Sequence, residues 1–177
     1  MMSDFLQGVL GPYYLQIKFI HLAAVMVWLF STSVAYVYYL VPAFKAWRKE
    51  PDDQSIKELR NWTMERFDDG ARLEHYAFPI ILITGPLLYL LSGYSTADDW
   101  MLLKLMFVIG LFIPIEILDY YISHFGGAKK NIRKEGNDEK YERYVRLHWN
   151  FFVYITAPIS VLGLTTVYLA VVKPSFS

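Results

Sequence analysis

The chain has 177 residues, of which 55% are hydrophobic and 18% aromatic, and its formal net charge is zero. A single soluble domain of this length seldom buries so much apolar surface, so a lipid environment is expected to cover the remainder. Cysteine is absent, which excludes disulfides, thiolate metal sites and cysteine nucleophiles and leaves histidine, carboxylates and lysine for chemistry.

Four stretches are long and apolar enough to cross a bilayer as helices, which takes about 20 residues each. They cover residues 13–41, 71–91, 100–123 and 145–172. Because unpaired backbone polar groups are costly in hydrocarbon, each stretch is predicted to be a continuous helix, with kinks at Pro79, Pro86, Pro114 and Pro158. The sequence therefore predicts an all-α fold in which residues 1–177 form one integral membrane bundle of four transmembrane helices.

Basic residues are concentrated in the two long connections of this bundle, and they fix its expected orientation. Only three basic side chains lie elsewhere, Lys18, Lys104 and Lys173. Since positively charged loops stay in the cytoplasm, both connections are expected on the cytoplasmic side of the inner (plasma) membrane, and both termini on the other side. The basic residues are matched by acidic ones and are explained by topology, so nucleic-acid binding is not expected. The two basic groups are Lys45, Arg48, Lys49, Lys57, Arg60, Arg66 and Arg72, and Lys129, Lys130, Arg133, Lys134, Lys140, Arg143 and Arg146.

The connection before the second span has four residues that recur at helical spacing. Ile56, Leu59, Thr63 and Phe67 follow this spacing among charged residues. The pattern is typical of an amphipathic helix on the membrane surface, and equally of a solvated extension of the second span. In the second connection, Gly126 and Gly127 are expected to end the third helix, followed by a polar hairpin or loop.

In the outward half of the bundle, the ionisable residues of interest are His21 and Lys104. His21 shares a helix stripe with Trp28 in the first span, where a neutral imidazole can ligate heme iron and the aromatic ring can wall a porphyrin. A histidine bonded to a neighbouring helix or to headgroup water is the alternative. Lys104 either extends to the headgroups or, beside His21, neutralises a porphyrin propionate or an anionic tetrapyrrole.

A second group of ionisable residues belongs to the cytoplasmic half. Glu116 and Asp119 occupy one face of the third helix, and His75 and His148 lie at nearly the depth of Asp119 on the second and fourth helices. This set is compatible with a divalent metal site, a proton relay or a bis-histidine heme site. An ion-pair cluster with Arg72 and Arg146 is the structural alternative. His124 is expected to be a capping or interfacial residue.

The segments IKFIHLAAVMVWLF, WTMERF, RLEHYAFPI, WMLLKLMFV and LAVVKP resemble the membrane-embedded, heme-binding protoporphyrinogen oxidase family and its copper-resistance relatives. The resemblance extends from about Ile17 to Pro174 and implies a small bundle of transmembrane helices. It assigns heme binding to His21 and activity to Lys104. Further matches are the segment Met64 to Arg66 and the terminal pair Lys173 and Pro174.

The chain also departs from that family. Leu118 and Asp119 replace a Tyr-His pair late in the third helix, and Ile155 to Pro158 replace an Asn-Glu-x-Pro segment in the fourth. His75, His148 and Glu116 are additional to the family pattern. The departures leave room for a related bundle with a different task.

Three functions follow from these observations. The first is a b-type heme protein, an oxidoreductase related to protoporphyrinogen IX oxidase. In it Lys104 is catalytic, and heme is held by His21, Trp28 and Lys104. Its partner is a tetrapyrrole or a quinone. The second is a transmembrane metal-binding or transport protein that uses His75, Glu116, Asp119 and His148, with a divalent ion in place of heme. The third is an accessory subunit without chemistry of its own. Small residues such as Ala23, Ala24 and Gly110 permit close helix contacts, including those of a homo-oligomer.

Overall fold

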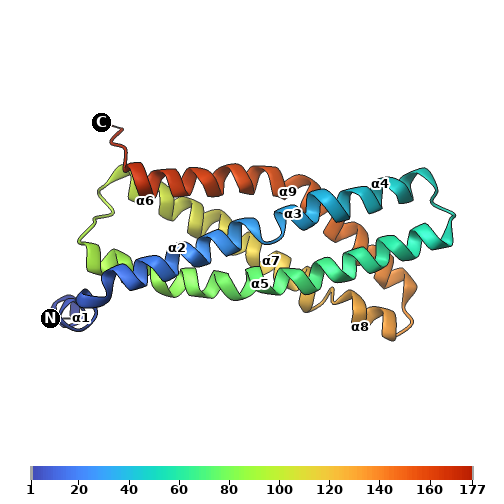
Figure 1. Ribbon diagram of the computed structural model, residues 1–177, viewed down its shortest axis with the longest axis horizontal. Helices are drawn as coiled ribbons and strands as arrows, with labels where there is room; N and C mark the ends of the chain where they lie inside the picture. Colours follow the sequence, from blue (N-terminus) through green and yellow to red (C-terminus); the bar gives the residue numbers. More distant parts are fainter. Residues whose placement is uncertain (1, 177) are drawn as a thin grey trace.

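The computed structural model describes residues 2–176, and this part of the chain is built from helices and short connections. Four helical rods are long and apolar enough to cross a membrane, and they comprise Phe5–Lys49, Gln54–Ser92, Asp99–Lys134 and Asp138–Val172. They run side by side in a bundle (Figure 1). The elements in chain order are α1 (Met2–Leu10), η1 (Gly11–Tyr13), α2 (Tyr14–Phe30), α3 (Ser33–Ala35), η2 (Tyr36–Leu40), α4 (Val41–Lys49), α5 (Gln54–Ser92), α6 (Asp99–Phe107), η3 (Val108–Phe112), α7 (Ile113–His124), α8 (Lys129–Lys134) and α9 (Asp138–Val172).

The two ends of the bundle differ in what they carry. One end, which we call the terminal end, holds α1, the C-terminal segment and the turn between α5 and α6 (Figure 1). The opposite end, the charged end, holds the turn between α4 and α5 and the α8 segment. Both basic connections predicted from the sequence therefore lie at one end of the bundle, and both chain ends lie at the other.

The second rod is a single α-helix from Gln54 to Ser92, so the residues 56–67 extend the second span and do not form a separate surface helix. Asp53 starts this helix, because its carboxylate accepts hydrogen bonds from the backbone N–H groups of Ser55 and Ile56. Bonds from the Ser55 hydroxyl and these two amides hold the pKa of Asp53 below its usual value. The helix ends at Gly93, which adopts the left-handed conformation (φ 69°).

The helices of the first and third spans are not α-helical throughout, because each contains a π-helical segment. η2 runs directly into Pro42 of α4, and η3 into Pro114 of α7. In each, the residue before the proline donates its amide to a carbonyl five residues earlier, Val41 to Tyr36 and Ile113 to Val108. A proline has no amide to bond the carbonyl four residues back, and the wider π turn accommodates that loss. Pro79, Pro86 and Pro158 instead lie inside α5 and α9.

Apolar side chains cover the outside of the bundle, and many polar ones lie within it. Phe19, Tyr76 and Tyr154 are each more than 70% exposed, whereas His148 is fully buried and Asp119 is 5% exposed. This arrangement is the reverse of a soluble domain and suits a protein whose surroundings are lipid. The buried polar groups must then find partners inside the bundle.

Aromatic packing closes the charged end around a buried arginine. Phe44 stacks on Trp149 with ring centroids 4.1 Å apart, and the guanidinium of Arg60 lies 4.4 Å from the ring of Trp47. Arg60 also donates to Asn61 and Glu142. These contacts fix α4, α5 and α9 against one another and so set the positions of the helices that carry the polar interior.

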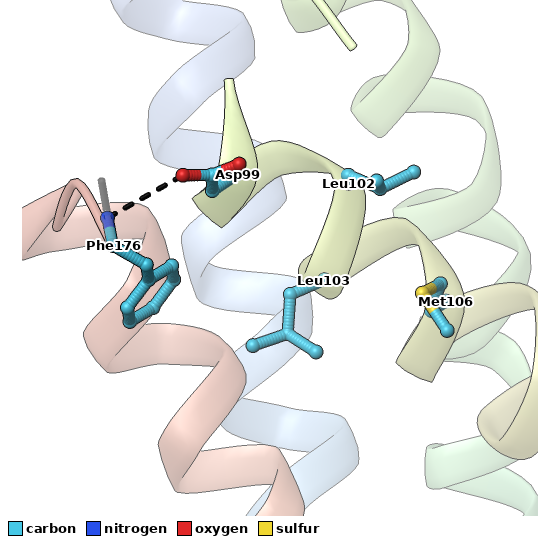
Figure 2. A pocket seen from close by; sticks show the side chains of 5 residues that line it. All are labelled: Asp99, Leu102, Leu103, Met106 and Phe176. Atoms are coloured by element: carbon cyan, nitrogen blue, oxygen red, sulfur yellow. Dashed lines mark hydrogen bonds between the residues drawn. The ribbon is translucent and has the colours of Figure 1, made fainter. Parts of the chain in front are cut away.

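The terminal end is joined by weaker and more exposed contacts. Lys173 donates to the hydroxyl of Tyr94 and lies over the rings of Tyr94 and Trp100. A hollow of about 420 Å³ lies here, and the amide of Phe176 bonds Asp99 at 3.4 Å. Figure 2 shows this bond and the five side chains that line the hollow. Apart from Asp99 its lining is apolar, as expected near lipid.

Candidate functional site

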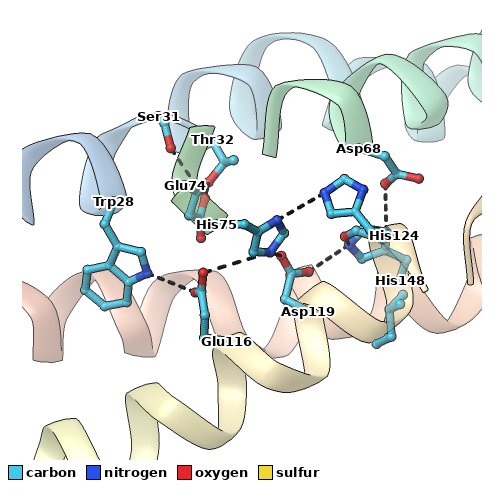
Figure 3. A network of polar contacts seen from close by, with 12 residues as sticks. Trp28, Ser31, Thr32, Asp68, Glu74, His75, Glu116, Asp119, His124 and His148 are labelled. Carbon is cyan, nitrogen blue, oxygen red and sulfur yellow. Dashed lines mark hydrogen bonds and ion pairs between the residues drawn. The ribbon is translucent and has the colours of Figure 1, made fainter. Parts of the chain in front are cut away.

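Asp119 on α7 is the centre of a polar network inside the charged half of the bundle (Figure 3). Its Oδ2 lies 3.2 Å from Nε2 of His75 on α5, and its Oδ1 lies 3.0 Å from Nε2 of His148 on α9. All three side chains are buried. The sequence prediction that these residues of three helices converge at one depth is therefore matched by the geometry.

Lys129 determines which nitrogen of His148 carries the hydrogen. Its ammonium lies 2.7 Å from Nδ1 of His148, and Oδ1 of Asp68 lies 3.2 Å from the same nitrogen. When Lys129 is charged and His148 is neutral, Nδ1 accepts from the ammonium and Nε2–H points at Asp119. The same ammonium donates to Asp68 at 2.9 Å and to the carbonyl of Ile122 at 3.2 Å. Lys129 is 1% exposed. His148 is thus a fixed donor that holds one oxygen of Asp119.

His75 connects Asp119 to His124 along a second branch. When neutral His75 donates from Nε2 to Asp119, its Nδ1 keeps the lone pair and accepts a hydrogen from Nε2 of His124, 3.1 Å away. The two rings are nearly perpendicular, at 83°. Because both nitrogens of His75 are engaged, this imidazole is a continuous link between His124 and Asp119.

Glu116 lies one turn deeper than Asp119 and is only partly satisfied. Its Oε2 accepts from the indole N–H of Trp28 at 2.9 Å. Its Oε1 is buried and has no hydrogen-bond partner among residues 2–176, and Nε2 of His75 is 3.9 Å away. Nearby, Glu74 accepts a 2.6 Å bond from Thr32. Both glutamates sit well inside the membrane-spanning part of the chain.

Two cavities lie on either side of the His75–Asp119 pair. A cleft of about 480 Å³ at the charged end is lined by residues that include Asp68, His75, His124 and Lys129. A smaller cavity of about 70 Å³ lies deeper, and its lining includes Trp28, Thr32, Ser33, Glu74, Glu116, Asp119, Thr156 and Ser160. Hydrogen bonds from His124 through His75 to Asp119 therefore span the protein layer between the cleft and the inner cavity.

The His21 site is sparser. Thr84 donates its hydroxyl hydrogen to the carbonyl of Ile80 at 2.6 Å, so its oxygen accepts from Nδ1 of His21 at 2.8 Å. Neutral His21 then has its lone pair on Nε2. Lys104 is half-buried. The three cavities described above border neither residue.

Trp28, predicted to wall a porphyrin, faces the other site. Besides its bond to Glu116, its ring packs against Phe78 and Phe112 at centroid distances of 5.6 and 5.2 Å. Ala24, Trp28, Phe78 and Phe112 belong to one buried apolar cluster. Trp28 thus closes the inner cavity on the side of the terminal end.

The divalent metal site stays a prediction. Among residues 2–176, no group of three or more histidines, aspartates or glutamates is arranged to hold a metal ion. The orientation of His148 is one physical reason, since its Nε2–H faces Asp119 and its lone pair is taken by Lys129.

The basic partner of the cluster differs from the one that the sequence suggested. Arg72 lies 3.8 Å from Asp69, and Arg146 is exposed, whereas Lys129 enters the cluster. His124, expected to cap α7 or to lie at the interface, bonds His75. The sequence could have predicted that Asp68 belongs to the cluster, because Asp68 lies two helical turns before His75 on the same helix face. Lys129 reaches the site through the fold of the connection, for which the sequence carries no periodic signal.

The comparisons with known proteins identify the family. Residues 15–174 match the model of a family described as "Predicted integral membrane protein (DUF2269)". The chain belongs to this family. No curated protein and no solved structure shows significant similarity to the chain. Membership agrees with the four membrane-spanning rods and with a bilayer as the surroundings of the protein.

Proposed function

We propose that the protein takes up protons at its charged end and delivers them to carboxylates in the middle of the membrane, as the proton-handling part of a transport protein. The observation that carries the proposal is the hydrogen-bonded chain from His124 through His75 to Asp119, between the cleft and the inner cavity. Ionisable residues at such depth are costly unless paired or functional. Histidine is the side chain best suited to exchange protons near neutral pH.

The transfer conserves protons at each step. A proton from the cleft binds Nδ1 of His124, whose Nε2 proton passes to Nδ1 of His75. The Nε2 proton of His75 then passes to Asp119, 3.2 Å away, or to Oε1 of Glu116, 3.9 Å away. Each imidazole gains one proton and loses one, so one proton moves from the cleft to a carboxylate.

The second branch positions the acceptor. Lys129 is bonded to Asp68, to the carbonyl of Ile122 and to His148, so His148 keeps its hydrogen toward Asp119. This bond fixes one oxygen of Asp119 and leaves the other facing His75. Residues Asp68, Lys129 and His148 therefore act through Asp119.

The path ends at the inner cavity, because the apolar cluster of Ala24, Trp28, Phe78 and Phe112 follows it toward the terminal end. A route that opens toward one side suits the uptake step of a carrier and not an open pore. The charged end faces the cytoplasm of the inner (plasma) membrane and the termini face outward, since the basic residues gather at that end.

Time-resolved infrared spectroscopy after a rapid drop in pH tests the proposal, because it detects protonation of buried carboxylates. In the wild type we expect a carboxylic-acid signal that disappears in Glu116→Gln or Asp119→Asn. His124→Gln should slow its appearance at least about tenfold. Asp52→Asn alters an exposed acid in the turn before α5 and should leave rate and amplitude unchanged. A rate unaffected by both His124→Gln and His75→Gln would contradict the relay.

A b-type heme oxidoreductase is the second candidate, and the His21–Thr84 bond favours it. That bond leaves the Nε2 lone pair that an axial ligand needs, and such outer hydrogen bonds commonly orient heme and metal ligands. His21 would hold the iron and Lys104 a propionate, as the resemblance to protoporphyrinogen oxidases implies. Bound heme would supply one-electron chemistry. The purified protein should then show a Soret band that His21→Ala abolishes, and a protein without the band after heme supplementation would exclude this function.

A further inference from the structure

The inner cavity between α2, α5, α7 and α9 is lined by polar atoms that accept hydrogen bonds. Ser33 donates its hydroxyl hydrogen to the carbonyl of Leu29 at 3.1 Å, and Ser160 donates to that of Thr156 at 2.8 Å. Both oxygens are left with lone pairs. Thr32 gives its hydrogen to Glu74. The cavity thus presents oxygen atoms whose own hydrogens are directed elsewhere.

Glu116 adds an oxygen that nothing in the described part of the chain satisfies. Its side chain is 9% exposed, it lines the cavity, and its Oε1 has no hydrogen-bond partner. A buried carboxylate oxygen without a partner is costly. Protonation relieves that cost, and so does a bound cation.

The cavity volume limits the cation to a small one. A volume of about 70 Å³ accommodates an ion with a few water molecules, because one water needs about 10–15 Å³ on this measure. Carboxylate and hydroxyl oxygens are the ligands that hard cations prefer. No imidazole lines this cavity, and the site does not require three carboxylates.

We propose that this cavity binds a small monovalent cation, with Glu116 and Glu74 as charged ligands and Ser33 and Ser160 as neutral ones. The cation would be the ion that the proposed carrier transports. Only its competition with a proton rests on the proposed function. A cation and a proton neutralise the same carboxylate, so the two bind in exchange for one another. The relay from His124 then supplies the proton that displaces the cation.

The ionisable groups near Glu116 come from three helices. Glu74 and His75 belong to α5, Asp119 to α7, and His148 to α9 behind Asp119. His148 is held by Lys129, and Asp119 accepts from two imidazoles. Glu116 and Glu74 are therefore the groups whose protonation the cation should oppose.

Thermal unfolding of the purified protein in NaCl and in choline chloride at equal ionic strength tests the binding. Sodium should raise Tm in a concentration-dependent way, since a ligand of the folded state stabilises it. Glu116→Gln and Ser160→Ala should weaken sodium binding by at least about tenfold, the effect of 1.4 kcal/mol. Two controls that do not line the cavity, the exposed Glu139→Gln and the half-buried Thr165→Ala, should retain it. Thr165 makes the same hydroxyl-to-backbone bond on α9. Equal Tm values in the two salts would overturn the proposal.

The pH dependence separates this inference from the relay. If one proton leaves for each sodium bound, sodium affinity should rise about tenfold per pH unit over the range where the carboxylate is protonated. An affinity independent of pH would contradict the exchange. His124→Gln should leave sodium affinity unchanged while slowing the infrared signal. A normal infrared signal without any sodium effect would refute the cation site and leave the proton relay standing.

Discussion

The charged half and the terminal half of the bundle treat their histidines in opposite ways. In the charged half, His75 and His148 both bond Asp119, and His124 bonds His75. Acidic residues from two helices surround these histidines. In the terminal half, His21 has a bond to the hydroxyl of Thr84. The difference shows two ways to hold a buried histidine. Its ring nitrogens can bond other ionisable side chains, or one nitrogen can keep a lone pair that is available to a ligand. The first arrangement favours proton transfer, and the second favours binding.

The largest expected effect comes from removing the lysine that anchors the network. Lys129→Met leaves Asp68 and the carbonyl of Ile122 without their buried partner, and breaking such a pair costs about 3–5 kcal/mol. Lys130→Met removes the partly exposed pair with Asp69 and should cost at most about 1 kcal/mol. Denaturant titration in detergent measures both. Equal losses in the two variants would show that Lys129 does not organise the network.

Comparing substitutions of two tryptophans measures the contribution of the hydrogen bond from the Trp28 indole to Glu116. Trp28→Phe removes the donor to Oε2 of Glu116, whereas the buried indole N–H of Trp149 has no partner in the part of the chain that the structure describes. Both substitutions shrink an aromatic ring, so Trp28→Phe should be more destabilising by about 1.5–3 kcal/mol, the contribution of a bond to a charged group. The same unfolding titration checks it. A smaller loss in Trp28→Phe than in Trp149→Phe would mean that Glu116 gains little from the indole.

Thr84→Val tests the terminal half and should have a smaller effect, about 1 kcal/mol, because one neutral hydrogen bond is lost. The control Thr165→Val removes a hydroxyl that bonds only its own helix. If His21 binds heme, Thr84→Val should also shift the Soret band, whereas a band identical to that of the wild type would show that Thr84 does not orient the ligand.

The smallest effect concerns the exposed start of α5. The folded state lowers the pKa of Asp53, so its contribution to stability is present above 3.8 and is lost as the pH falls through the lower folded-state pKa. Asp53→Ala should therefore be less stable than the wild type at pH 7, and the gap should close in acid. A gap that persists at low pH would show that the charge of Asp53 is irrelevant to the cap.

The sequence carried enough information for the four spans, the gathering of basic residues at one end and the convergence of His75, Asp119 and His148. These features depend on hydropathy and helical period, which are local. The π segments before Pro42 and Pro114 were not predicted, because prolines usually suggest kinks. In the sequence, Lys129 is one of seven basic residues of the second connection and indicates only the topology. Its entry into the core depends on how residues 125–137 fold back, which no periodic pattern encodes.

The partners of each histidine determine which nitrogen carries its hydrogen. Nitrogen-15 NMR of protein labelled at histidine measures this directly for the four histidines. We predict neutral Nε2–H forms for His75, His124 and His148 and the Nδ1–H form for His21. An Nδ1–H form of neutral His148, or an Nε2–H form of His21, would contradict the account.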